Sequence, residues 1–222
     1  MDIKSVGIVG AGQMGNGIAH VFALAGYDVL LSDVSDEALS AARTKISGNL
    51  DRQVARGRIG EGTRDAALAR IGTTLDLPQV GAADLIIEAA TENEDIKNKI
   101  IASIGPHIGK EPILPSTPSS ITITRLASRT DRPEKFMGFH FMNPVPVMQL
   151  VELIRGIATD RETYETLTGV VRTLGKTAAS AEDFPAFIVN RILMPMINEA
   201  IYTLYEGVGS VESIDTSLKL GA

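Results

Sequence analysis

A glycine-rich segment near the beginning of the chain constrains the fold more than any other feature. An apolar run is followed by the sequence GAGQMG at residues 10–15, and apolar residues then recur at helical spacing as far as residue 25. This order predicts a strand, a tight turn and a helix. In such a turn Gly10 permits the backbone conformation, Gly12 lets a ligand approach the backbone, and Gly15 lets the helix pack closely on the strand.

The predicted turn has the properties of a dinucleotide-binding site. Free N–H groups and the positive end of the helix dipole favour a pyrophosphate, and Gln13 and Met14 lie where that helix begins. A second apolar strand ends before Asp33, which lies 23 residues after Gly10. An acidic residue there can bind a ribose diol and would repel a 2′-phosphate, so the sequence predicts NAD rather than NADP. The alternative is a tight turn that binds no ligand.

Composition excludes several classes of protein. A formal net charge of −6 argues against a nucleic-acid or membrane-surface protein, because either would need a basic face. The chain contains no cysteine, which excludes disulfides, thiolate metal sites and cysteine nucleophiles, and nothing else suggests a metal site. No apolar run is long enough to span a bilayer and no secretory signal pattern opens the chain, so we expect a cytoplasmic protein.

Strand and helix patterns alternate along most of the chain and predict an α/β protein with a Rossmann-type, doubly wound sheet. After the first two strands, further strands are predicted over residues 83–90, 112–116, 135–141, 148–154 and 177–181. Helices over residues 35–57 and 64–70 interrupt this alternation as a helical insertion. Ser35, Thr91 and Thr159 are the predicted caps of three helices.

Three arginines, Arg52, Arg56 and Arg58, lie on or just beyond the first inserted helix. Charged residues on such a helix commonly form a solvated face. The alternative interpretation is a clamp for the phosphates of an anionic substrate.

The character of the chain changes from residue 185 onward. Residues 187–206 predict a long and very apolar helix, and Ser210 can cap another that ends at Gly221. Such helices need a partner surface. The sequence therefore predicts an NAD-binding domain over residues 1–184 and the start of an incomplete, all-helical domain over residues 185–222.

One of the three histidines has a pattern that suggests catalysis. His140 precedes a proline-rich reversal, and if the extended runs on either side return antiparallel, Glu152 can meet it. A carboxylate fixes the tautomer of an imidazole and stabilises the imidazolium, as proton transfer from a hydroxyl requires. On this pattern alone, a structural histidine remains the alternative.

Four long motifs resemble the 3-hydroxyacyl-CoA dehydrogenase family, especially its bacterial 3-hydroxybutyryl-CoA dehydrogenases. They are GAGQMGNGIA, IIEAATEN, HFMNPVPVMQLVELIRG and the segment from FIVNRILMPMINEAIYTLYEG to KLGA, and they cover almost all 222 residues. The resemblance implies NAD-dependent oxidation of an L-3-hydroxyacyl-CoA, of short chain, to a 3-ketoacyl-CoA, or the reverse reduction. It also implies an acyl-CoA substrate and, for a full-length chain, a homodimer.

The resemblance assigns catalytic roles to four residues. His140 would take the proton of the 3-hydroxyl group as the hydride passes to the nicotinamide, and Glu152 would hold that histidine. Ser119 would hydrogen-bond the substrate oxygen, and Asn190 would reach the same region from the long helix. The alternatives are that Ser119 caps the short helix near residues 121–128 and that Asn190 satisfies the backbone where the long helix begins.

Further positions would bind the cofactor and coenzyme A. Besides the glycine-rich turn and Asp33, the resemblance implies cofactor contacts for Glu92, Lys97 and Asn143, and a CoA contact for Arg56. The alternatives are that Glu92 only favours a helix dipole and that Lys97 is a solvated helix residue.

The sequence departs from the family pattern in three ways. Relatives read SNTSS where residues 116–120 read STPSS, so Pro118 removes a backbone donor beside Ser119. Ala186 replaces a glycine, which would cause strain if that position needs a positive φ. The family also continues for several helices beyond KLGA, which implies a shortened chain. Two other functions therefore remain, an NAD-binding module with impaired catalysis and a hydroxy-acid dehydrogenase such as gulonate dehydrogenase.

Overall fold

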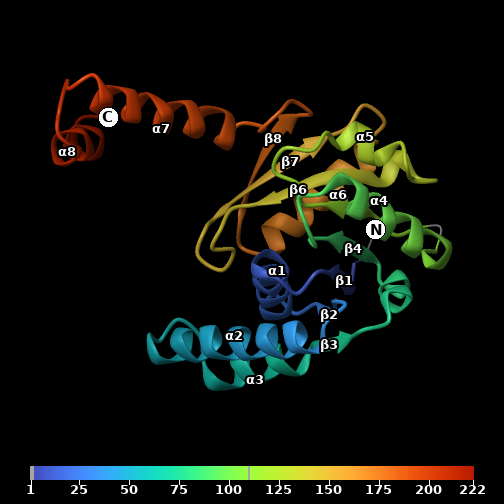
Figure 1. Cartoon of the computed structure of the whole chain (residues 1–222). Coiled ribbons are helices and arrows are strands. Elements are labelled where there is room, and N and C mark those ends of the chain that lie inside the picture. The colour runs from blue at the N-terminus through green and yellow to red at the C-terminus, as the bar shows by residue number, and fades with distance from the viewer. Residues whose placement is uncertain (1–2, 110) are drawn as a thin grey trace.

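A single eight-stranded sheet organises the computed structural model, which describes residues 3–109 and 111–222 (Figure 1). The strand order is β3-β2-β1-β4-β5-β6-β7-β8. The strands are β1 (Ser5–Val9), β2 (Asp28–Ser32), β3 (Ile71–Thr74), β4 (Leu85–Glu88), β5 (Leu114–Ser116), β6 (Phe136–Phe141), β7 (Leu150–Arg155) and β8 (Thr177–Glu182). Neighbouring strands are parallel except β6 and β7, which are antiparallel. The predicted doubly wound α/β fold is confirmed.

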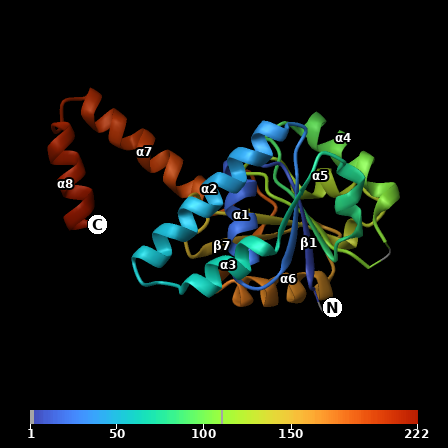
Figure 2. The same cartoon turned by 90° about the horizontal axis from the view of Figure 1, so that it is seen from below.

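Helices cover both faces of the sheet (Figures 1 and 2). They are α1 (Gln13–Leu24), α2 (Asp36–Ala55), α3 (Glu61–Ala69), α4 (Glu94–Ile104), α5 (Ile123–Ala127), α6 (Arg161–Thr173), α7 (Val189–Tyr205) and α8 (Val211–Gly221), with short 3-10 turns over residues 77–82, 105–107 and 133–135. One core cluster joins the sheet to α1, α2, α3 and α6. The other joins it to α4 and α5.

The alternation of side chains along β6 sets the direction of the predicted catalytic histidine. Met137, Phe139 and Phe141 belong to the first core, whereas Phe136 belongs to the second. Because successive side chains of a strand point to opposite faces, His140 shares the face of Phe136. It therefore lies on the same side of the sheet as α5.

Strand β3 was not predicted, and two predicted helix caps are wrong. The first residue of strand β3 is buried but the next two are exposed, and the sequence Ile-Gly-Thr-Thr carries no apolar alternation, so the pattern gives no signal for this edge strand. Helix α4 is capped by Asn93 rather than Thr91, and α6 by Asp160 rather than Thr159. The Thr159 hydroxyl instead donates to the carbonyl of Phe136. The caps predicted at Ser35 and Ser210 are confirmed.

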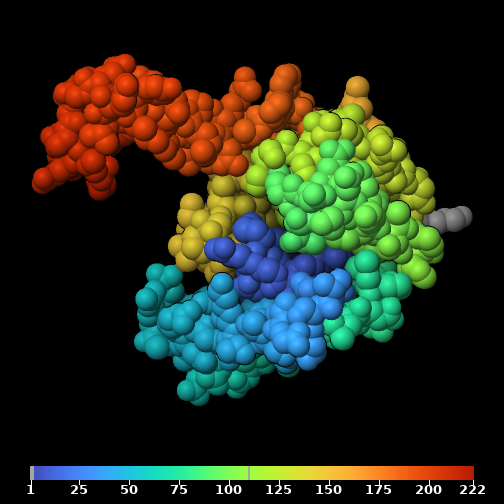
Figure 3. Space-filling model, in the orientation of Figure 1, coloured from blue at the N-terminus to red at the C-terminus, as the bar shows by residue number. Residues whose placement is uncertain are grey.

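Helices α7 and α8 project away from the sheet (Figures 1 and 3). No residue of either helix is buried in the described chain, although α7 exposes large apolar side chains such as Ile192 and Tyr205. The segment is thus as apolar as the sequence predicts, and its apolar side chains are exposed. Among the described residues, no helix is long and apolar enough to cross a membrane.

A buried ion pair connects strands and a helix behind the carboxyl edge of the sheet. Glu88 ends β4, and one carboxylate oxygen accepts hydrogen bonds from Lys97 Nζ at 2.6 Å and Ser116 Oγ at 2.5 Å. The other oxygen accepts from the backbone N–H of Ala90 at 2.9 Å. Glu88 is fully buried and Lys97 is 1% exposed. The pair thereby fixes α4 against β4 and β5.

We expect Lys97→Met to lower the free energy of unfolding by about 3–5 kcal/mol, because it leaves the Glu88 carboxylate buried without its counter-charge. Lys99→Met is the matched control, since Lys99 is an exposed lysine on the same helix and its loss should cost less than about 0.5 kcal/mol. Urea denaturation measures both. Equal stability of the two variants would contradict a structural role for the pair.

Candidate active site

The glycine-rich turn between β1 and α1 has the predicted geometry. Gly10 has a φ of +102°, and a Cβ there would lie 2.6 Å from Ala90 Cα. A Cβ on Gly15 would overlap the Gly10 carbonyl oxygen, so the helix passes too close for any side chain. Gly12 is different, because a Cβ there would meet no protein atom within 4 Å. Its backbone therefore faces open space into which a ligand can come.

The start of α1 has the features of an anion site next to an acidic residue. No side chain caps this helix in the described chain, which leaves its first N–H groups available. Asp33 follows β2 and accepts a hydrogen bond from the N–H of Ala11 at 2.7 Å through one oxygen and from Ser35 N at 3.2 Å through the other. The turn and the acidic residue are thus brought together as the sequence predicts.

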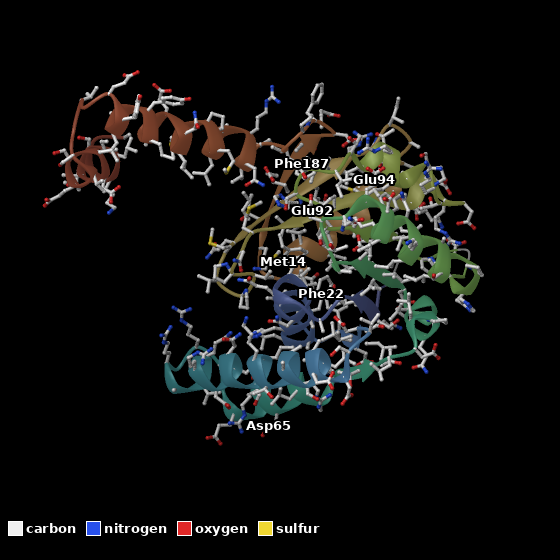
Figure 4. The ribbon with its side chains drawn as sticks, in the orientation of Figure 1. Met14, Phe22, Asp65, Glu92, Glu94 and Phe187 are labelled. Atoms are coloured by element: carbon white, nitrogen blue, oxygen red, sulfur yellow. The ribbon has the colours of Figure 1, made fainter. Side chains whose placement is uncertain are left out.

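A loop between β6 and β7 closes over the N-terminal end of α1. Gln13 Nε2 donates to Asn143 Oδ1 at 2.9 Å, which joins two of the predicted cofactor residues. Met14 lies at the same end of the helix, beneath this edge of the sheet (Figure 4). Gly17 is in close contact with Val145 of the loop. The glycine-rich turn and the loop are therefore one packed unit.

The predicted pairing of His140 with Glu152 is confirmed. The antiparallel register of β6 and β7 places the two residues opposite each other, and His140 Nδ1 lies 2.8 Å from Glu152 Oε2. His140 is 5% exposed and Glu152 is fully buried. A carboxylate at Nδ1 assigns the hydrogen to that nitrogen and leaves Nε2 as the acceptor for a proton.

Glu152 also holds the beginning of α7. Its second oxygen, Oε1, accepts hydrogen bonds from the backbone N–H groups of Ile188 at 3.1 Å and Val189 at 2.9 Å. The carboxylate therefore has three protein donors, which suits a buried ionised group. Because Glu152 satisfies these amides, the alternative that Asn190 satisfies the backbone at this helix start is wrong. Asn190 lies in the first turn of α7.

The serine loop after β5 is held by Glu92. One carboxylate oxygen accepts from Ser119 N at 2.9 Å, Ser120 N at 2.8 Å and Ser120 Oγ at 2.8 Å. Thr117 N donates to Glu88 O, so the residue before Pro118 keeps its backbone hydrogen bond. Glu92 thus acts on the loop rather than only on a helix dipole.

Two alternatives for the sequence-predicted residues are corrected. The amides at the start of α5 are capped by both oxygens of Asp183, each at 2.8 Å, so Ser119 does not cap that helix. Lys97 is not a solvated helix residue, because its ammonium group binds Glu88 and Ser116 in the interior. The ammonium group of Lys97 therefore does not reach the glycine-rich turn, where the sequence predicted a cofactor contact.

The departure from the family pattern at Ala186 has a structural consequence. The backbone at this position does require a positive φ, +67°, and the residue is not glycine.

The arginines of the helical insertion face the β6–β7 loop. Arg52, Arg56 and Arg58 line a cavity of about 140 Å³ whose opposite wall contains Pro144 and Pro146. These arginines are exposed, as a solvated face would be, and they also converge on one concave surface. Figure 3 shows this side of the molecule hollowed between α2 and α7.

A hydrogen bond between α1 and α2 fixes the arginine-bearing end of the insertion. His20 lies 3.0 Å from Gln53, nitrogen to nitrogen. Burial first, and then the nearby Lys176 charge, lower the pKa of His20 to about 4, so it is neutral and its Nε2 accepts from the Gln53 amide. His20 therefore has a structural role.

Sequence reasoning missed two residues that support the site. Lys176 donates to the carbonyl oxygens of Val145 and Met148, both at 2.7 Å, and so holds the β6–β7 loop. Burial lowers the pKa of this lysine. Asp183 was also missed as the cap of α5. Both bind backbone groups more than 25 residues away in the sequence, and no local sequence pattern reveals contacts of that kind. The one sequence signal was for Lys176, which directly follows the helix-ending Gly175.

Two family descriptions match the chain. "3-hydroxyacyl-CoA dehydrogenase, NAD binding domain" matches residues 5–184, and "3-hydroxyacyl-CoA dehydrogenase, C-terminal domain" matches residues 187–222. The first description agrees with the prediction of NAD.

Individual relatives agree with this. The 3-hydroxybutyryl-CoA dehydrogenase of Bradyrhizobium diazoefficiens is 59% identical over 220 residues, which are 99% of this chain and 75% of that protein. Human mitochondrial hydroxyacyl-coenzyme A dehydrogenase is 39% identical over 227 residues, covering 99% of this chain and 72% of that protein. The crystal structure of (S)-3-hydroxybutyryl-CoA dehydrogenase from Ralstonia eutropha is similar with a TM-score of 0.95 and 46% identity, over 99% of this chain and 78% of that one. The chain belongs to the 3-hydroxyacyl-CoA dehydrogenase family.

Proposed function

We propose that this chain catalyses the NAD-dependent oxidation of a short-chain L-3-hydroxyacyl-CoA, such as 3-hydroxybutyryl-CoA, to the 3-ketoacyl-CoA, and the reverse reduction. The observation that carries the proposal is the buried His140–Glu152 pair at the same edge of the sheet as the open turn at Gly12. The names of the relatives support the substrate class, since two of them are 3-hydroxybutyryl-CoA dehydrogenases.

Proton transfer is the task of His140. In the oxidation its Nε2 takes the proton of the substrate 3-hydroxyl group, and the C3–H bond breaks as its electron pair leaves with the hydride. Bound NAD supplies the hydride acceptor. The imidazolium that forms keeps its Nδ1 hydrogen bond to Glu152, whose negative charge stabilises it. In the reduction His140 returns the proton to the oxygen.

The remaining residues bind and orient. We assign the substrate oxygen to Ser119, on the loop that Glu92 holds, and to Asn190 on α7. The turn at residues 10–15 would hold the pyrophosphate, and Asp33 the adenosine ribose. Glu92 and Asn143 lie on the two loops that border the turn, and they would contact the nicotinamide half of NAD. Lys97 would not contact the cofactor directly but would hold the ends of β4 and β5 in place through Glu88 and Ser116.

We also propose the division into parts over residues 1–184 and 185–222, a homodimer, and a cytoplasmic location. The exposed apolar side chains of α7 and α8 support a second copy as the partner of these helices. The acidic net charge is compatible with a protein of the cytoplasm.

We expect Gly12→Val to weaken NADH binding about 100-fold without loss of stability. The Cβ of the new side chain would meet no protein atom within 4 Å, and the side chain would occupy the approach to the helix amides, where charge-assisted hydrogen bonds contribute about 1.5–3 kcal/mol each. Isothermal titration with NADH measures the affinity and thermal unfolding measures the stability. Gly62→Val, at another glycine with open space around it, is the control. Unchanged NADH affinity in Gly12→Val would place the cofactor elsewhere.

We expect His140→Ala to lower kcat for acetoacetyl-CoA reduction about 1,000-fold, because a positioned general acid or base contributes about 10²–10⁴-fold. NADH consumption measures the rate, and the NADH affinity should stay within about two-fold since the imidazole binds no cofactor phosphate. His107→Ala, at an exposed histidine, is the control and should keep the wild-type rate.

The same assay separates the competing functions. A wild-type chain that binds NADH but does not reduce acetoacetyl-CoA would be an NAD-binding module. Turnover that is equally fast in His140→Ala would remove the proposed mechanism.

We expect Arg56→Ala to raise KM for acetoacetyl-CoA about three- to ten-fold with little change in kcat, because an exposed arginine contributes about 1 kcal/mol to a phosphate contact. The increase should diminish at high salt. Arg161→Ala removes an exposed arginine on α6 and should change neither constant. If Arg52, Arg56 and Arg58 can all be replaced without effect on KM, a free hydroxy acid becomes the better substrate class.

A further inference from the structure

The junction between β8 and α7 has an unusual backbone. Two consecutive residues, Ala186 and Phe187, have φ values of +67° and +53°, and neither is a glycine. Side chains of L residues rarely tolerate this region, so the surrounding contacts must hold the conformation. Such backbone outliers cluster at functional sites, and this one lies directly beside the catalytic pair.

The left-handed turn places the Phe187 ring on His140. The two rings are 5.3 Å apart between centroids and inclined at 62°, an edge-to-face contact. Phe187 is 4% exposed, and Figure 4 shows it at the junction of the sheet with α7. The same turn delivers the next two backbone N–H groups to Glu152. One short segment therefore contacts both members of the pair.

The contacts constrain different degrees of freedom of the imidazole. The hydrogen bond from Nδ1 to Glu152 fixes the tautomer and one point of the ring, but coupled rotation about the side-chain torsions χ1 and χ2 would still move Nε2. An aromatic ring packed edge-to-face against the imidazole opposes this rotation, because such pairs have a preferred mutual angle. Together the two contacts restrict the direction in which Nε2 points.

We propose that Phe187 is a positioning residue for His140, held over the imidazole by the left-handed turn at residues 186–187. The proposal rests on the proposed function, because it concerns proton transfer by the same histidine. The competing explanation is that Phe187 only fills the core. Phe136 allows the two to be separated, since it belongs to the same core cluster, is fully buried and lies on the strand of His140.

Phe187→Leu and Phe136→Leu are compared in acetoacetyl-CoA reduction. We expect Phe187→Leu to lower kcat at least ten-fold while the KM values for acetoacetyl-CoA and NADH stay within three-fold. Phe136→Leu should lower the melting temperature at least as much but leave kcat within three-fold. If Leu at position 187 unfolds the protein, Phe187→Met takes its place, because methionine fills a similar volume without a ring.

A double-mutant cycle with His140→Ala tests whether Phe187 acts through the histidine. In the His140→Ala background, Phe187→Leu should lower the residual rate by less than two-fold, because the group that it positions is absent. An equal fall in both backgrounds would overturn the proposal. So would a fall in kcat from Phe136→Leu that matches that from Phe187→Leu.

A spectroscopic measurement reads the placement without turnover. The imidazole C–H resonances of three histidines are assigned by their loss in single variants, and Phe187→Leu should shift those of His140 by removing a ring current while leaving His107 unchanged. An unshifted His140 resonance would overturn the proposal. If the wild-type chain reduces no acetoacetyl-CoA and the His140 resonances still shift in Phe187→Leu, the result contradicts the proposed function alone.

Discussion

The Glu152 carboxylate is the interaction on which the arrangement of the site depends. It lies on β7, accepts from His140 on β6, and accepts from two backbone amides at the start of α7. A buried carboxylate with fewer donors would be costly, since each unsatisfied lone pair has left water. The need to satisfy Glu152 therefore fixes the histidine and the departing helix together.

The remaining residues follow from the geometry of a parallel sheet. Strand β1 leads into the Gly10 turn, β2 into Asp33, β4 toward Glu92 and β5 toward Ser119. Parallel strands end at one edge, so residues far apart in the chain meet there. Strand β7 runs the other way, and its antiparallel pairing with β6 brings Glu152 to His140. The single reversal in the sheet thus creates the His140–Glu152 pair.

Much of this could be predicted because the signals are local. The glycine-rich turn can be recognised from six consecutive residues. The pairing of His140 with Glu152 is predicted because the two residues lie about equally far in sequence from the reversal between their strands. Strand β3 could not be predicted, since its edge position and two threonines leave no apolar pattern. The cap at Asn93 was missed because Thr91 offers an equally good capping sequence, and only the backbone decides between them. Neither interpretation of Lys97 anticipated a buried ion pair, because its acid, Glu88, is nine residues away on a strand.

The site consists of one part held by several contacts and one part with a narrower attachment. The first part is the turn with its loop: Gln13 and Asn143 join the two, and Lys176 holds the loop through two hydrogen bonds. Helix α7 is attached at its start through Glu152 and the Phe187 ring, and beyond that its apolar side chains are exposed. Any displacement of α7 must therefore act on the two contacts that orient His140. The proposed substrate contact at Asn190 would consequently lie on the helix whose start is bound to both neighbours of His140, Glu152 and Phe187.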